Sequence, residues 1–147
     1  MAAMRPADLV ERVAAALEPV EAVRVAWVFG SRVAGTATAR SDLDVAVVFG
    51  RSLGDAERER ARRRVVAALT DALGAVGERA DVVDVERAGS SVAFRALRDG
   101  ARVVARSERE RVAAEVRVAR RYDDDAPRRE LYRRAARAHV GPRSDRP

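Results

Sequence analysis

The chain contains no cysteine and only one histidine. Without cysteine it can form neither a disulfide framework nor a thiolate metal site. The histidine, His139, lies close to the C-terminal end, so a histidine metal centre or a Ser-His-Asp hydrolase would have to recruit a residue of the tail. The composition therefore argues against disulfide-stabilised proteins, thiolate-metal proteins and histidine-dependent hydrolases.

Long apolar runs are also missing. No stretch approaches the roughly 20 residues that cross a membrane as a helix. Glu11 and Glu18 fall inside the first periodic segment, which therefore lacks the apolar core of a signal peptide. We expect a cytoplasmic protein that has no membrane partner.

Lysine is absent, so all 29 basic residues are arginines. A net charge of +6 and a pI of about 11.1 would ordinarily indicate nucleic-acid binding. Uniform use of arginine, however, is typical of coding-sequence composition, and acids alternate with arginines in residues 57–64 and 107–121, as on a solvated helix face. The sequence does not favour a nucleic-acid surface, although Arg133, Arg134 and Arg137 could form a local basic face for an acidic partner.

The length of 147 residues predicts one domain. We assign residues 1–125 to its main body and residues 126–147 to a C-terminal helix and tail of the same domain. The tail, residues 141–147, is expected to be frayed.

Apolar periodicity predicts alternating elements along the chain. Helices are expected over about 7–18, 55–73, 90–98, 107–122 and 128–139, with a short helical turn within 30–38, and strands over 23–29, 43–49, 80–85 and 102–105. Strands separated by helices predict an α/β or α+β fold, with a sheet flanked by helices.

The most informative segment joins the first two predicted strands. Gly30-Ser31 ends the first, and Ser41-Asp42-Leu43-Asp44 begins the second. Side chains alternate along a strand, so Asp42 and Asp44 point to the same side. Mg²⁺ is commonly held by one or two carboxylates together with substrate phosphates. Glycine lets the backbone approach an anion, and neighbouring amides and a hydroxyl can donate to phosphate oxygens. Each half alone is an ordinary turn or strand end, but together they predict a metal-dependent phosphate site.

These residues resemble a known signature. Gly30-Ser31, Gly35 and Ser41-Asp42-Leu43-Asp44 are similar to the motif of the DNA polymerase beta-like nucleotidyltransferase superfamily, in particular its minimal nucleotidyltransferases, the MNT proteins. The similarity continues through residues 80–88 and 96–104 and covers about residues 20–125. One position departs: relatives often carry an arginine before the loop glycine, where this chain has Ala34. The resemblance implies the polymerase-beta-like fold, with a mixed sheet flanked by helices.

The resemblance also implies a set of site residues. Asp42, Asp44 and a third acid would be catalytic and would hold two Mg²⁺ ions, with ATP as substrate. The nucleotide-binding residues would be Gly30, Ser31, Arg32 and Ser41.

Two acids compete for the third position. Asp81 and Asp84 are three residues apart and so face opposite sides of a strand. We prefer Asp81, because it opens the apolar run as the family's acid does, whereas Asp84 has an ordinary alternative as a strand-end acid before the turn at 87–89.

Members of this size are commonly antitoxins paired with HEPN-domain toxins, and some attach AMP to a tyrosine of the toxin. The resemblance therefore implies a protein adenylyltransferase in a toxin–antitoxin pair. Two alternatives remain: transfer to a small molecule of the aminoglycoside type, and a non-catalytic antitoxin that acts by binding. The segment 107–139 is too short to enclose a small acceptor, which favours a macromolecular one.

Overall fold

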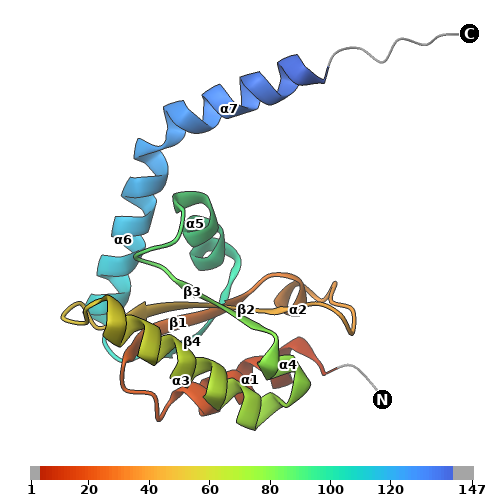
Figure 1. The fold of residues 1–147 in the computed structure, drawn as a ribbon, viewed down its shortest axis with the longest axis vertical. Helices are drawn as coiled ribbons and strands as arrows, with labels where there is room; N and C mark the ends of the chain where they lie inside the picture. The colour runs from red at the N-terminus through yellow and green to blue at the C-terminus, as the bar shows by residue number, and fades with distance from the viewer. Residues whose placement is uncertain (1–3, 141–147) are drawn as a thin grey trace, which may run out of the picture.

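The computed structural model describes residues 4–140, in which seven helices and four strands alternate (Figure 1). The strands are β1 (Val23–Phe29), β2 (Leu43–Phe49), β3 (Ala80–Asp84) and β4 (Ala101–Ala105). The helices are α1 (Pro6–Leu17), α2 (Ser31–Ala34), α3 (Asp55–Leu73), α4 (Ala75–Glu78), α5 (Ser90–Asp99), α6 (Glu108–Asp124) and α7 (Ala126–His139). The predicted tail, residues 141–147, lies outside the described residues.

The four strands form one mixed sheet in the order β3-β2-β1-β4. β1 runs antiparallel to both β2 and β4, whereas β2 and β3 are parallel. The C-terminal end of β1 therefore lies beside the N-terminal ends of β2 and β3. This confirms the predicted mixed sheet and brings the segments of the sequence motif to one end of it.

Helices cover both faces of the sheet. In the central strands, the odd-numbered and the even-numbered residues point to opposite faces, and both sets are largely apolar. Leu43, Val45, Val47 and Phe49 of β2 join the cluster formed with α1 and α3, and Ala46 and Val48 join the cluster formed with α5 and α6. Burying a valine or leucine fully contributes about 1.5–3 kcal/mol. Figure 1 shows α1, α3 and α4 on one side of the sheet and α5 and α6 on the other.

Helix α3 shows how the sequence sets both ends and the buried face of an element. Glu57 accepts a hydrogen bond from the backbone N–H of Gly54 (2.8 Å), which caps the first turn. Ala61, Val65 and Leu69 follow at intervals of four and are buried, while most arginines of the helix face solvent. The predicted bounds, 55–73, match the helix.

Three features differ from the sequence-based expectation. Helix α6 ends at Asp124, two residues later than expected. The four-residue helix α4 is too short to give a periodic signal. It packs tightly on the end of α3, because a Cβ at Gly77 would lie 2.1 Å from the backbone oxygen of Leu69. Helix α7 begins at Ala126, two residues earlier than expected, and Asp125 makes no capping bond of its own. Its carboxylate accepts a hydrogen bond from Ser90 of α5 instead.

Helix α7 extends away from the body (Figure 1) and buries none of its residues. Its principal contact is with α6. Within residues 4–140, no helix combines the length and the apolar character needed to span a membrane.

Candidate active site

Three carboxylates of the sequence motif lie at one end of the sheet. Asp42 immediately precedes β2, Asp44 is the second residue of β2, and Asp81 is the second residue of β3. Asp44 and Asp81 are register partners in the parallel pair, so their side chains lie next to each other on the same face. That face is the one covered by α5 and α6, because Ala46, two residues beyond Asp44, packs in their cluster. Asp42 and Asp81 are exposed, and Asp44 is half-buried.

Gly30 completes the site from the end of β1. Its φ of +79° and ψ of −161° form a backbone conformation that is essentially restricted to glycine. A Cβ at this position would lie 2.2 Å from Oδ2 of Asp44. The glycine is therefore needed twice, for the turn into α2 and for the close approach of the backbone to the Asp44 carboxylate.

The electrostatics of Asp44 reflect its crowded position. Burial raises the pKa of its carboxyl above the ordinary value, and the nearby charges of Asp81 and Asp42 raise this pKa further. The charge of Arg95 on α5 acts in the opposite direction. The charges of Asp42 and Asp81 therefore both oppose a charge on Asp44, and a cation bound beside Asp44 would relieve that repulsion.

The donor set suits a hard divalent cation. Within residues 4–140, no group of three or more acidic or histidine side chains is arranged to hold a metal ion by itself. Mg²⁺ does not require one, since it usually keeps several waters and takes one or two carboxylates together with phosphate oxygens of the substrate. Asp42, Asp44 and Asp81 could supply these carboxylate oxygens.

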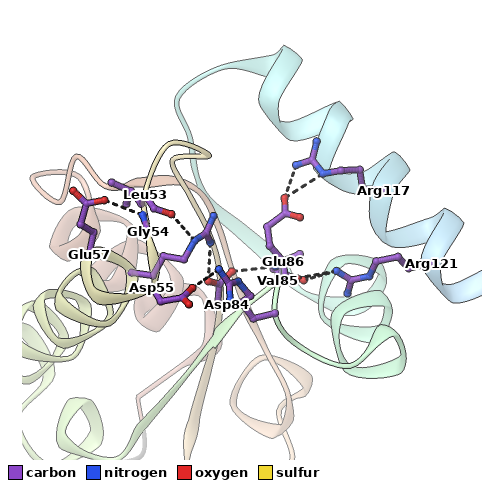
Figure 2. A network of polar contacts seen from close by, with 11 residues as sticks. Leu53, Gly54, Asp55, Glu57, Asp84, Val85, Glu86, Arg117 and Arg121 are labelled. Atoms are coloured by element: carbon purple, nitrogen blue, oxygen red, sulfur yellow. Dashed lines mark hydrogen bonds and ion pairs between the residues drawn. The ribbon is translucent and has the colours of Figure 1, made fainter.

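Asp84, the competing acid, belongs to the opposite face. Its Oδ2 accepts a hydrogen bond from Nη1 of Arg58 on α3 (2.8 Å), and these side chains are only 14% and 12% exposed. Its Oδ1 accepts the backbone N–H of Glu86 (3.0 Å). Figure 2 shows Asp84 in a network that continues through Glu86 to Arg117 of α6. The geometry places Asp81, not Asp84, beside Asp44; that Asp81 is the third ligand stays a prediction.

Residues 35–42, between α2 and β2, are held by side chains that bond to the backbone. Arg32 donates from Nε and Nη2 to the carbonyl oxygen of Ser41 (3.1 and 2.6 Å). The Ser41 hydroxyl accepts the N–H of Thr38 (2.9 Å), and Arg79 donates to the carbonyl of Ala39 (2.7 Å). Two residues predicted to bind nucleotide, Arg32 and Ser41, thus shape the loop that leads into Asp42. Ser31 is the first residue of α2.

Sequence reasoning missed Arg95 and Arg79. Arg95 lies on α5, and helical periodicity alone does not show which turn of α5 passes the acids. Arg79 precedes β3, and its contact with Ala39 joins positions 40 residues apart. Neither position carries a local pattern that would have indicated its role.

Comparisons with known proteins agree with this geometry. A family model described as polymerase beta, nucleotidyltransferase matches residues 11–109. No curated protein sequence matches the chain significantly.

Several solved structures share the fold. A toxin–antitoxin complex with AMP-PNP contains a chain that superposes with a TM-score of 0.64 at 19% identity, over 86% of this chain and 98% of that one. A complex of a tri-AMPylated Shewanella oneidensis HEPN toxin with an MNT antitoxin gives 0.59 at 16% identity, over 89% and 98%. The MntA–HepT toxin–antitoxin complex gives 0.58 at 17% identity, over 87% and 97%.

Proposed function

Because the chain belongs to the polymerase beta nucleotidyltransferase family, we propose that it transfers AMP from ATP to a tyrosine hydroxyl of a partner protein. The partner is a HEPN-domain toxin, and this chain is its antitoxin. The observation that carries the catalytic part of the proposal is the pairing of Asp44 with Asp81 beside Gly30.

In the proposed reaction, the hydroxyl oxygen of the acceptor bonds to the α-phosphorus of ATP. The bond from that phosphorus to the oxygen that bridges it to the β-phosphorus breaks, pyrophosphate leaves with this oxygen and the electron pair of the bond, and the hydroxyl proton passes to water. Bound Mg²⁺ would activate the hydroxyl and neutralise charge on the leaving pyrophosphate. Asp42 and Asp44 would hold both ions, and Asp81 would complete the ligand set on the acceptor side.

Gly30 and Ser31 would orient the triphosphate. The missing side chain of Gly30 lets the backbone lie against the Asp44 carboxylate. The Ser31 hydroxyl and nearby backbone amides could donate to the β- and γ-phosphates. Arg32 acts one step away, since its guanidinium holds the carbonyl of Ser41, which precedes Asp42.

The partner is proposed from likeness to the solved complexes, one with AMP-PNP and one with an AMPylated HEPN toxin. The surface supports a macromolecular acceptor. Among the described residues, one hollow of about 480 Å³ is lined by Met4 and residues of α1, and another of about 200 Å³ by residues at the C-terminal end of β2, Arg51 and residues of α6; none of the three acids lines either one. A protein hydroxyl could reach the exposed acids from outside, without an enclosed pocket.

The test is incubation of the purified chain with Mg²⁺, ATP labelled at the α-phosphate and a purified HEPN-domain protein from the same organism. We expect label on the HEPN protein and a mass increase of about 329 Da for one AMP. Asp44→Asn should abolish labelling, whereas Asp71→Asn, an exposed acid of α3, should not. Efficient labelling of an aminoglycoside, with the HEPN protein unmodified, would instead show a small-molecule enzyme. Tight binding of the HEPN protein without label would indicate a non-catalytic antitoxin.

A further inference from the structure

Helix α7 is amphipathic, and no other part of the described chain packs over its apolar face. Its sequence, APRRELYRRAARAH, contains five arginines and one glutamate. Leu131, Ala135 and Ala138 recur at helical spacing on one face, next to Tyr132, while Arg133 and Arg137 lie on the other. Leu131 is 67% exposed and Tyr132 is 61% exposed. A helix with an apolar face is ordinarily stabilised by packing that face, so α7 lacks the partner that its pattern requires.

The direction of α7 is set by contacts at its first turn. The rings of Phe94 on α5 and Tyr122 on α6 stack at 4.0 Å between centroids and 10° between planes. The guanidinium of Arg129 lies 3.5 Å from the centroid of Tyr122 and also donates to the Tyr122 carbonyl. Together with the bond from Ser90 to Asp125, these contacts join α5, α6 and α7. The arm is therefore fixed to the body rather than tethered by a loose linker.

The arm lies on the side of the sheet that carries the acids. Helix α5, which bears Arg95, covers the face of Asp44, and Figure 1 shows α7 beyond α5 on that same side. At 14 residues, α7 is about 21 Å long. A protein bound along it would stand over the face from which Asp42 and Asp81 are accessible.

We propose that α7 is a docking arm that binds an acidic, helical surface of the protein acceptor and so presents the acceptor hydroxyl to the acids. The proposal rests on the proposed function and adds the surface that recognises the partner. The charge of α7 selects the chemistry of that partner. The helix has five arginines but only one carboxylate, Glu130, which Arg133 (2.6 Å) and Arg134 (3.1 Å) share, so α7 keeps a net positive charge that favours acidic groups of another molecule.

Two other occupants fit less well. A second copy of this chain would bring two arginine-rich helices together, and like charges in contact oppose association. A nucleic acid would engage the arginines, but it would leave Leu131 and Tyr132 exposed. A protein surface can offer apolar side chains to Leu131 and Tyr132 and carboxylates to the arginines.

The experiment measures the affinity of the chain for the purified HEPN-domain protein, without ATP, by calorimetry. The arm variant carries Arg133→Glu and Arg137→Glu. The matched control carries Arg60→Glu and Arg64→Glu, two exposed arginines with the same spacing on α3, across the sheet.

A third variant, Leu131→Ala with Tyr132→Ala, tests the apolar face. We expect both arm variants to bind about tenfold more weakly or worse and the control to bind like wild type. Circular dichroism checks that the helices are kept.

Equal affinity of the arm variant and the control would overturn the docking arm, while AMP transfer by wild type would leave the proposed function in place. Loss of affinity in the arm variants, without transfer by wild type, would support the arm and contradict the reaction. Failure of wild type to bind the HEPN protein would overturn both. Two further results would overturn the docking arm alone. One is a dimer of wild type in sedimentation that is absent in the arm variants, and the other is binding of a labelled RNA or DNA duplex that only the arm variants lose.

Discussion

Asp44 of β2 and Asp81 of β3 are register partners across the only parallel pair of the described sheet, and both belong to the face covered by α5. Burial raises the pKa of the Asp44 carboxyl, and the neighbouring charge of Asp81 raises this pKa further. Such an arrangement costs stability in the free protein unless a cation binds. The pairing is therefore better explained by a site for a cation and phosphate than by a role in folding.

The first prediction concerns the response of stability to Mg²⁺. A cation that binds only the folded protein raises its melting temperature. We expect Mg²⁺ with a non-hydrolysable ATP analogue to raise the Tm of wild type but not that of Asp42→Asn or Asp44→Asn. In EDTA, Asp44→Asn should melt no lower than wild type, because it removes like-charge repulsion. Both variants should lose transfer by orders of magnitude. Differential scanning calorimetry and label transfer are the measurements, with Asp71→Asn as control, and full activity in either variant would refute the ligand assignment.

A second prediction compares two glycines that both have a φ of +79°. Gly35→Ala meets no atom within 4 Å, so it should cost about 1–2 kcal/mol of backbone strain and leave transfer largely intact. Gly30→Ala adds a collision with Asp44 and occupies the space next to the carboxylate. It should abolish transfer and the Mg²⁺-dependent rise in Tm. Comparable activity of the two purified variants would show that close approach at Gly30 is unimportant.

The third prediction separates Asp81 from Asp84 by opposite effects. Asp81→Asn should lower turnover by orders of magnitude with little change in stability, because Asp81 is exposed. Asp84→Asn should keep most of the turnover but destabilise the fold, since it leaves Arg58 without its buried partner. Breaking such a pair costs about 3–5 kcal/mol. The measurements are the free energy of unfolding in urea and the initial rate of AMP transfer, compared for the two variants and wild type. The reverse pattern would assign the metal site to Asp84.

The sequence predicted the elements that have strong periodicity and missed contacts that depend on packing. Strands 23–29 and 43–49 and helix 55–73 agree with the structure residue for residue, because apolar runs and a capping glutamate mark their ends. The alternation of side chains along a strand predicted that Asp81 and Asp84, three residues apart, lie on opposite faces. Which face meets Asp44 depends on the β2–β3 register, which no local pattern encodes.

The same limit applies at the C-terminal end of the chain. Periodicity predicted a helix near 128–139, but its direction depends on the stack of Phe94, Tyr122 and Arg129, which comes from three different helices. The charge of Arg95 acts on the Asp44 carboxylate because α5 packs on β1 and β2. Such contacts follow from tertiary packing, and a single sequence carries no signal for them.

The fourth prediction concerns pH. Glu110 of α6 accepts three hydrogen-bond contacts from Arg24 of β1. These bonds, with the charge of Arg24, lower the pKa of Glu110 below the ordinary value of 4.5 against the opposing effect of its burial. A lowered pKa in the folded state means that the pair stabilises the protein above the ordinary pKa and that this contribution is lost as pH falls through the lowered value. The side chains are 35% and 39% exposed, so the effect should be about 1 kcal/mol or less.

Glu110→Gln should therefore be less stable than wild type at neutral pH, and the difference should vanish in acid. Urea unfolding across this range measures it. Glu21→Gln, at an exposed glutamate, is the control. A difference that persists unchanged in acid would show that packing, not charge, holds α6 to the sheet.

The last prediction concerns how Arg32 contributes to the reaction. Its Nε and Nη2 both bond to the carbonyl of Ser41, so its main effect should be to position Asp42 rather than to bind nucleotide directly. Arg32→Ala should lower kcat by about tenfold or more through this misplacement, with a smaller change in the KM for ATP. Arg32→Lys should rescue little, because an ammonium group cannot reproduce the planar pair of donors. Arg40→Ala, an exposed arginine of the same loop, is the matched control and should behave like wild type. A large rise in KM with unchanged kcat, rescued by lysine, would instead show that the charge of Arg32 binds the triphosphate.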